Sequence, residues 1–349
     1  MTTILFFLSS GLFLGWSLGA NDAANVFGTA VSTKMVRFRT AAIICSVFLI
    51  IGAVKSGAGA SHTLGKLGTV NELAGAFVVA FSAAITVFFM TKLKLPVSTS
   101  QSIVGAIIGW NIFAGFKTNH KILIKIVSTW IICPVLAAVF SIIIYFLFKL
   151  FLKKMKIHLI VQDSMTRFGL IIVGAFGSYS LGANNIANVM GVFVKTSPFR
   201  DIDFYDLFTI TGTQQLFFIG AVAISVGVFT YSKRVMMTVG NSIFRLSPID
   251  ALGVVLSSSL VLFVFASSAL KNFLESISLP SFPLVPVSSS QAIVGAVIGI
   301  VIAKGGKNMH YGIMGKISAG WVSTPIISGF VSYFFLFFMQ NVFMQRVFL

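Results

Sequence analysis

Residues 19–28 read Gly-Ala-Asn-Asp-Ala-Ala-Asn-Val-Phe-Gly, a polar phrase inside an otherwise apolar stretch of the chain. Residues 182–191 read Gly-Ala-Asn-Asn-Ile-Ala-Asn-Val-Met-Gly, which is the same phrase with Asn185 in place of Asp22. We call these segments the first and second Asn phrases. Their occurrence once in each half of the chain indicates an internal duplication.

A second phrase also occurs twice, each time after an Asn phrase. Residues 96–109 read Pro-Val-Ser-Thr-Ser-Gln-Ser-Ile-Val-Gly-Ala-Ile-Ile-Gly, and residues 286–299 read Pro-Val-Ser-Ser-Ser-Gln-Ala-Ile-Val-Gly-Ala-Val-Ile-Gly. We call them the Ser-Gln phrases. A weaker third pair, a tryptophan four residues before a proline, follows at 130–134 and 321–325. The pattern predicts a duplicated protein whose polar phrases meet in one ion site.

The composition excludes a soluble protein. Of the 349 residues, 57% are hydrophobic and 9% are charged, and the mean hydropathy is +0.99. A soluble domain cannot bury so much apolar surface, so we expect a polytopic membrane protein in a lipid bilayer. The formal charge of +17 would suggest nucleic acid in a soluble protein. Here the bases gather at the ends of apolar runs, as in membrane proteins, so no nucleic-acid partner is expected.

Apolar runs mark the expected membrane segments, which are helical because backbone polar groups in lipid must be satisfied internally. The runs lie at 4–27, 41–60, 73–91, 103–116, 122–152, 168–194, 207–230, 249–270, 293–303 and 311–344. The runs 103–116 and 293–303 are shorter than the roughly 20 residues that a span needs, which predicts half-helices or re-entrant hairpins. The expected fold class is an all-α polytopic membrane protein with about 10 to 12 membrane segments.

Five runs in each half invert the second half relative to the first, a common transporter construction. We expect a first membrane repeat at 1–152, a basic linker at 153–167, and a second, inverted repeat at 168–349. Most basic residues fall in loops that follow odd-numbered runs. This asymmetry predicts a cytoplasmic linker and both termini outside the cytoplasm. We expect the plasma membrane as the location.

Asp22 is the only acidic residue deep within an apolar run. A buried carboxylate is costly and usually marks an ion or proton pathway. The alternative, an ion pair with the nearest base, Lys34, is disfavoured because that base lies several turns away. Carboxylate and amide oxygens are hard ligands that suit Na⁺. The predicted cation ligands are Asn21, Asp22, Asn25, Asn184, Asn185 and Asn188, with Na⁺ itself at Asp22, Asn25, Asn185 and Asn188. Interhelical hydrogen bonding is the alternative for the asparagines.

Each Ser-Gln phrase is predicted to start a helix at or near membrane depth. Ser98 followed by Gln101 fits a capping box, as does Ser288 followed by Gln291. A helix N-terminus presents free N–H groups and a partial positive charge, which suits an anion. Neither phrase contains a base, so neutral donors must bind it; the alternative is an ordinary capped helix start. The predicted anion ligands are Ser98, Thr99, Ser100, Gln101, Ser288, Ser289, Ser290 and Gln291.

At these phrases the chain resembles the inorganic phosphate transporter (PiT) family, which includes sodium/phosphate symporters and sulfate permeases. The first Asn phrase resembles the family signature, residues 27–34 continue it, and the resemblance covers both halves in order. It implies secondary transport of inorganic phosphate coupled to Na⁺, or to H⁺ in some members. It also implies an inverted repeat, helical hairpins and a homodimer.

Three features depart from the family pattern. Asn185 replaces a second aspartate found in many members, Gln101 and Gln291 replace histidines, and the additional membrane glutamates have no clear counterparts. The Asn-Asn pair resembles the sulfate branch, whereas the intact phrase around Asp22 resembles the phosphate branch. We expect a phosphate importer driven by a cation, Na⁺ rather than H⁺, with no cofactor and no enzymatic activity. A sulfate permease and a passive anion channel are the alternatives.

Overall fold

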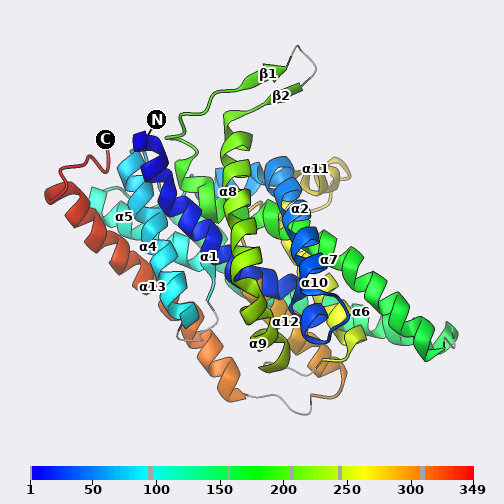
Figure 1. Cartoon of the computed structure of the whole chain (residues 1–349). Helices are drawn as coiled ribbons and strands as arrows, with labels where there is room; N and C mark the ends of the chain where they lie inside the picture. Colours follow the sequence, from blue (N-terminus) through cyan, green and yellow to red (C-terminus); the bar gives the residue numbers. More distant parts are fainter. Residues whose placement is uncertain (1, 93–96, 156–157, 205–207, 243–245, 307–310) are drawn as a thin grey trace.

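The computed structural model describes residues 2–92, 97–155, 158–204, 208–242, 246–306 and 311–349, and these are mostly helical (Figure 1). The first half contains α1 (Thr2–Ser32), α2 (Phe38–Ser56), α3 (Ala58–Leu64), α4 (Leu73–Lys92), α5 (Thr99–Ala114) and α6 (His120–Met155). The second half contains α7 (Leu159–Met190), the 3-10 turn η1 (Gly191–Phe193), β1 (Ile202–Phe204), β2 (Phe208–Ile210), α8 (Gly212–Thr230), α9 (Ser232–Ser242), α10 (Pro248–Ala266), α11 (Ser268–Ser276), α12 (Ser289–Ala303) and α13 (Tyr311–Asn341).

Among the described residues, eight helices are long and apolar enough to cross a membrane: α1, α2, α4, α6, α7, α8, α10 and α13. The remaining two expected runs form α5, with 16 residues, and α12, with 15. Both are shorter than a full span, as the sequence predicts. The outer surface carries large apolar side chains such as Phe330, which is 74% exposed. The chain is therefore an all-α polytopic membrane protein.

The helices of the two halves pack in a reciprocal pattern. Helix α1 packs against α4 and α8, while its counterpart α7 packs against α10 and α2. Helix α5 packs against α4 and α13, while its counterpart α12 packs against α10 and α6. Each of these helix pairs therefore has a counterpart in which the matching helices of the other half take part, as a duplicated fold requires. The inversion of the second repeat stays a prediction.

Two matched glycines set the closest helix contacts. A Cβ added to Gly19 on α1 would collide with the Ile224 carbonyl on α8, and one added to Gly182 on α7 would collide with the Leu49 carbonyl on α2. Such small residues let helix backbones approach closely in membranes. Both glycines belong to the Asn phrases, so the phrases that carry the polar side chains also fix the packing of their helices.

Helices α6 and α7 extend beyond the apolar runs into the segment 153–167. Helix α6 continues to Met155 and α7 begins at Leu159, whereas residues 156–157 lie outside the described part of the chain. At 1.5 Å per residue, α6 is about 54 Å long, more than the roughly 30 Å hydrocarbon core. The expected linker is therefore helical over most of its described length. The division into two repeats at this point stays a prediction.

A short β-hairpin precedes α8, and its second strand lies at the start of the run 207–230, which the sequence analysis took as helical. Strands β1 and β2 pair antiparallel, with Ile202 opposite Ile210 and Asp203 opposite Thr209. The hairpin projects beyond the helical bundle at the same end as both chain termini (Figure 1). Because both termini lie at the same end, the chain crosses the membrane an even number of times. Which end faces the cytoplasm stays a prediction.

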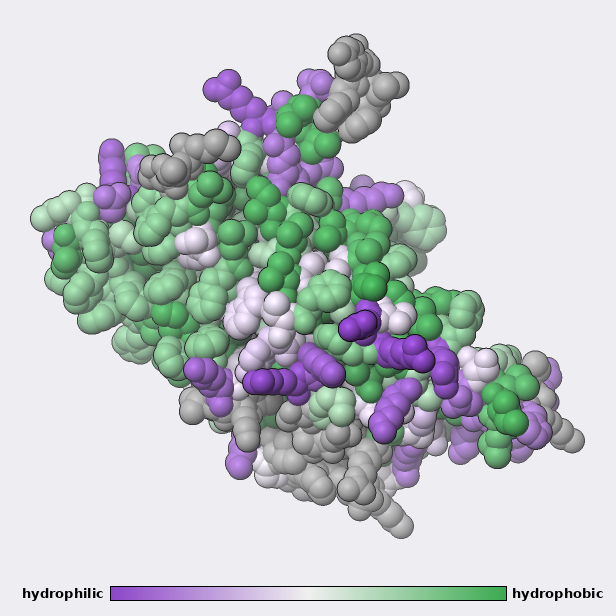
Figure 2. Space-filling model, in the orientation of Figure 1, coloured by the Kyte–Doolittle hydropathy of each residue, from purple (hydrophilic) through white to green (hydrophobic). Residues whose placement is uncertain are grey.

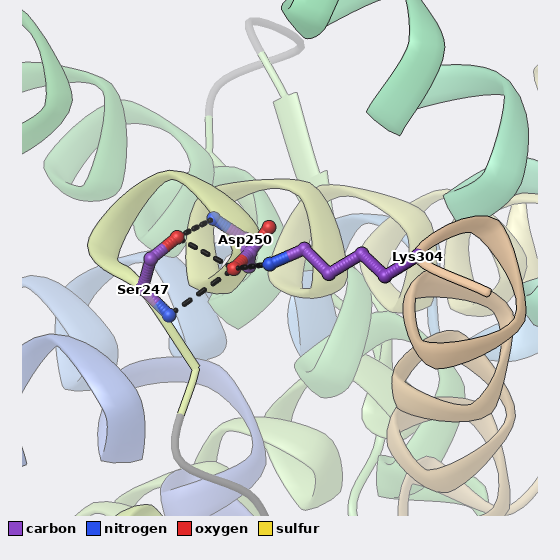
Figure 3. A network of polar contacts seen from close by, with 3 residues as sticks. All are labelled: Ser247, Asp250 and Lys304. Carbon is purple, nitrogen blue, oxygen red and sulfur yellow. Dashed lines mark hydrogen bonds and ion pairs between the residues drawn. The ribbon is translucent and has the colours of Figure 1, made fainter. Parts of the chain in front are cut away.

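Hydrophilic side chains also border the opposite end of the bundle. Figure 2 shows an apolar middle zone with hydrophilic residues along its lower edge. At this end Lys304, which follows α12, forms an ion pair with the buried Asp250 in the first turn of α10 (Figure 3). Asp250 Oδ2 also accepts from Ser247 N at 3.2 Å, and Ser247 Oγ accepts from Asp250 N at 3.2 Å. A capping box and an ion pair thus join the start of α10 to the end of α12.

Candidate functional site

The four phrases lie on four different helices. The first Asn phrase is in the continuous part of α1, and the second closes α7. The Ser-Gln phrases supply the starts of α5 and α12, although Pro96 lies outside the described residues. All the predicted ligands are buried except Asn21 and Asn25, which are partly buried. The two short helices are therefore the ones that begin inside the protein with polar residues.

Both short helices begin with the same cap. Ser98 Oγ accepts from Gln101 N at 3.3 Å, and Ser288 Oγ accepts from Gln291 N at 3.2 Å. The capping-box prediction is nevertheless wrong in one respect. In neither helix does the glutamine side chain bond back to the cap serine, because both Oε1 atoms are buried without a hydrogen-bond partner in the described structure. The glutamines are thus available to a ligand.

Asp22 is bonded to the start of α12. Ser289 Oγ donates to Asp22 Oδ2 at 2.7 Å, and Asn25 Nδ2 donates to Ser289 Oγ at 3.2 Å. Asn21 Nδ2 lies 3.4 Å from Asp22 Oδ1. No Lys or Arg forms an ion pair with Asp22 among the described residues. Residues 267 positions apart in the sequence thus place the predicted cation and anion ligands in direct contact.

Asn184 holds the backbone that leads into α12. Its Nδ2 donates to Val285 O at 3.1 Å, and its Oδ1 accepts from Val287 N at 2.9 Å. Both amide atoms are used, and the side chain is fully buried. In this structure Asn184 therefore positions the second Ser-Gln phrase, and its role as a cation ligand stays a prediction.

The second Asn phrase also has buried polar atoms without partners. Asn188 Nδ2 donates to Asn185 Oδ1 at 3.0 Å, which leaves Asn185 Nδ2 and Asn188 Oδ1 unpaired in the described structure. The Thr99 hydroxyl on α5 is unpaired as well. Buried polar groups without partners are uncommon and costly. Their gathering on these phrases fits a site that receives a polar ligand.

The two Ser-Gln phrases meet. Ser290 Oγ, on α12, donates to Val97 O just before α5 at 3.1 Å. The two helix starts therefore lie side by side, and their partial positive charges act on a common region. Because no base takes part, an anion there would be held by hydroxyls, amides and backbone N–H groups.

The structure adds two tryptophans that the sequence analysis noted as a repeat without assigning a role. A Cβ on Gly295 would collide with the Pro134 carbonyl, and one on Gly299 would collide with the Ala138 carbonyl, so α12 and α6 run parallel here. Gln291 and Trp130 each lie four residues before the first of these contacts on their own helices. Trp130 Nε1 is buried without a partner, and so is Nε1 of its counterpart, Trp321. The repeated Trp–Pro spacing is the sequence signal that marks both.

The described residues do not resemble a transition-metal centre. They contain no group of three or more His, Cys, Asp or Glu side chains placed to hold a metal ion. The side chains around Asp22 are amides and a hydroxyl, whose oxygens, like those of the carboxylate, are of the kind that hard cations prefer. The arrangement fits a weakly bound alkali cation beside an oxyanion.

Comparison with known proteins decides the family. A family model described as the phosphate transporter family matches residues 18–271 and 279–348. This chain belongs to the phosphate transporter family. Members of that family are transporters, so the protein is a transporter and not an enzyme.

Relatives extend over nearly the whole chain. A putative phosphate permease of Methanocaldococcus jannaschii is 28% identical over 317 residues, which cover 90% of this chain and 91% of the relative. A sulfate permease of Bacillus subtilis is 27% identical over 328 residues, which cover 92% of this chain and 84% of the relative. The solved structure of a sodium-dependent phosphate transporter is similar in fold, with a TM-score of 0.76 at 23% identity. That match covers 98% of this chain and 100% of the other.

Proposed function

We propose that the protein imports inorganic phosphate by symport with a cation, and that the cation is Na⁺ rather than H⁺. The contact between Ser289 and Asp22 carries this proposal. Among the described residues it joins the start of a short helix, which suits an anion, to the one carboxylate deep within a membrane helix. Asp22 with the asparagines of both Asn phrases binds the cation. The serines, Thr99 and the two glutamines of the Ser-Gln phrases bind phosphate.

Coupling follows from the charges. An oxyanion held only by neutral donors is costly to place in a low-dielectric site. A monovalent cation about 4 Å away contributes on the order of 4 kcal/mol at an effective dielectric constant near 20. Na⁺ bound at Asp22 would supply that offset, so phosphate affinity rises when the cation is bound. The reverse holds equally, because coupling between two bound ligands is reciprocal.

The sulfate permease of Bacillus subtilis makes sulfate the second candidate, and Asn185 is the residue that favours it. The two anions differ in one respect that matters here, since phosphate can donate a hydrogen bond and sulfate cannot. An ionised carboxylate accepts about four hydrogen bonds, and Asp22 receives only those from Ser289 and Asn21 in the described structure. The remaining capacity of Asp22 favours phosphate.

Uptake into proteoliposomes tests the proposal. Radiolabelled phosphate is supplied with an inward Na⁺ gradient, with a choline gradient, and with an inward proton gradient, each with and without excess sulfate. We expect uptake that requires Na⁺ and that sulfate does not inhibit. Uptake driven only by protons would reassign the coupling ion, and full inhibition by sulfate would move the protein to the sulfate branch. Uptake that follows membrane potential with no cation requirement would indicate a passive channel.

Asp22→Asn is the decisive variant, because it keeps the shape of the side chain and removes its charge. We expect Na⁺-driven uptake to fall roughly 100-fold or more, since the interaction lost is worth several kcal/mol. Asp163→Asn, a half-exposed acid at the start of α7, is the matched control and should transport normally. Normal Na⁺-driven uptake by Asp22→Asn would refute the assignment. The homodimer, the orientation and the plasma-membrane location stay predictions.

A further inference from the structure

An open apolar groove lies between the end of α6 and the start of α7, with the start of α10 as its floor. Its volume is about 120 Å³, and its lining includes Phe148, Phe151, Leu152, Met165, Ile249 and Leu252. Gln162 and Thr166 add polar atoms on the α7 wall. No residue of the four phrases lines it, so the groove is separate from the candidate transport site.

The groove opens between apolar outer walls. Phe151 is 46% exposed, Met165 is 46% exposed, and Phe168 on the same part of α7 is 65% exposed. In a protein that spans a membrane, such surfaces contact acyl chains. Because the groove is narrow and bounded by three helices, it would hold one acyl chain in a fixed position, unlike the rapidly exchanging lipids around the rest of the protein.

The α6 wall is flanked by cations. At 100° per residue, Lys149 lies about 100° to one side of Phe148, and Lys154 lies about 60° beyond Phe151 on the other side. Lys153 accompanies them in the last turn of α6. All three are exposed, and long lysine side chains extend toward a membrane surface while their stems stay in apolar surroundings.

Negative charge near the groove is already neutralised. Asp163 pairs with Arg167 one turn later, at 3.3 Å, and Asp250 at the floor pairs with Lys304. The α6 lysines form no ion pair with any described residue. The groove therefore combines an apolar trough with two to three uncompensated positive charges at its mouth. Basic pockets between helix ends of this kind suit anionic lipid headgroups.

We infer that this groove binds one anionic phospholipid, with an acyl chain against Phe148, Phe151 and Leu252 and the headgroup phosphate between Lys149 and Lys154. The charge at the mouth selects an anionic headgroup over a zwitterionic one. A second copy of this chain is disfavoured as the occupant, because it would have to bring compensating acidic groups and the described surface has few.

Quenching by brominated lipids tests this inference. The reporter is Phe151→Trp, an aromatic exchange on the groove wall, with Phe148→Trp as a second reporter in case the first does not fold. Each purified variant is reconstituted in vesicles of phosphatidylcholine containing a fixed fraction of phosphatidylglycerol. The acyl chains of one lipid or the other are brominated. Fluorescence of the unsubstituted protein, which has its own four tryptophans, is subtracted.

We expect the quenching to show that the groove binds phosphatidylglycerol more tightly than phosphatidylcholine, by about fivefold for each lysine that contacts the headgroup. Lys149→Gln with Lys154→Gln should bring that preference close to one. Lys121→Gln with Lys125→Gln, which removes the same charge from the opposite end of α6, should leave it unchanged. Equal quenching by both lipids in the reporter variant that keeps its lysines would overturn the inference, because the groove would then not select the headgroup. Absence of quenching by either lipid would also overturn it, because protein would then cover the groove.

Discussion

Replacing Asn184 by alanine tests how the start of α12 is held. The change removes two hydrogen bonds, of 3.1 and 2.9 Å, and leaves the Val285 carbonyl and the Val287 N–H buried without partners. Each buried backbone group left unpaired costs about 1–3 kcal/mol, so the variant should lose about 2–6 kcal/mol of unfolding free energy. Hydrogen bonds between membrane helices average nearer 0.6 kcal/mol, which sets a lower bound of about 1 kcal/mol.

Phosphate affinity should fall as well, because the segment that Asn184 holds leads directly into the predicted phosphate ligands. If about 1.4 kcal/mol of the binding free energy is spent on ordering that segment again, phosphate affinity falls about tenfold. We therefore expect the phosphate concentration for half-maximal uptake to rise about tenfold or more. Thermal unfolding in detergent and concentration-dependent uptake in proteoliposomes measure the two effects on the same preparation.

Asn111→Ala is the matched control. This buried asparagine also makes two hydrogen bonds, to Leu67 O at 3.2 Å and to Thr118 Oγ1 at 2.9 Å, at the far end of α5 from the site. It should lower stability by a similar amount and leave the phosphate dependence of uptake unchanged. Asn184→Ala with a normal phosphate dependence, or Asn111→Ala with the same tenfold rise, would refute the reasoning.

Three other variants probe separate features. Trp130→Phe keeps the aromatic bulk and removes the buried N–H, so phosphate affinity should fall severalfold with no loss of thermal stability; an unchanged affinity would exclude the indole from the site. Asp250→Asn should lower stability by about 1–3 kcal/mol through its buried capping contacts. A double-mutant cycle with Lys304→Ala should return less than about 1 kcal/mol of coupling, since the lysine is half exposed. Gly19→Ala should prevent accumulation of folded protein, whereas Gly28→Ala, whose nearest neighbour would lie 3.7 Å from the new Cβ, should express normally.

The sequence alone is informative about the membrane helices and about which phrases meet. Each expected apolar run contains a helix, because the bilayer leaves the backbone few other choices. The internal duplication marks the polar phrases as candidate site residues, because the same phrases occur in both halves of the chain. The contact between Asp22 and Ser289 agrees with the expectation that the phrases form one site.

Other features depend on contacts that no local pattern encodes. The two atoms of Asn184 bond to backbone about a hundred residues away, so its positioning role appears only in three dimensions. Strand β2 begins an apolar run that the sequence analysis took as helical, so its pairing with β1 was not predicted. The glutamines fit a capping pattern, but in the folded protein their side-chain oxygens make no hydrogen bond to the cap serines.

The reciprocal packing also constrains how the protein is made. Helices α1 and α5 from the first half pack most extensively against α8 and α13 from the second, and α13 is the last helix described. While the ribosome is still translating the second half, the first half is already in the membrane with those faces uncovered. Maturation must therefore wait for the final helix to insert, and quality-control proteases have their longest access to the chain during that interval.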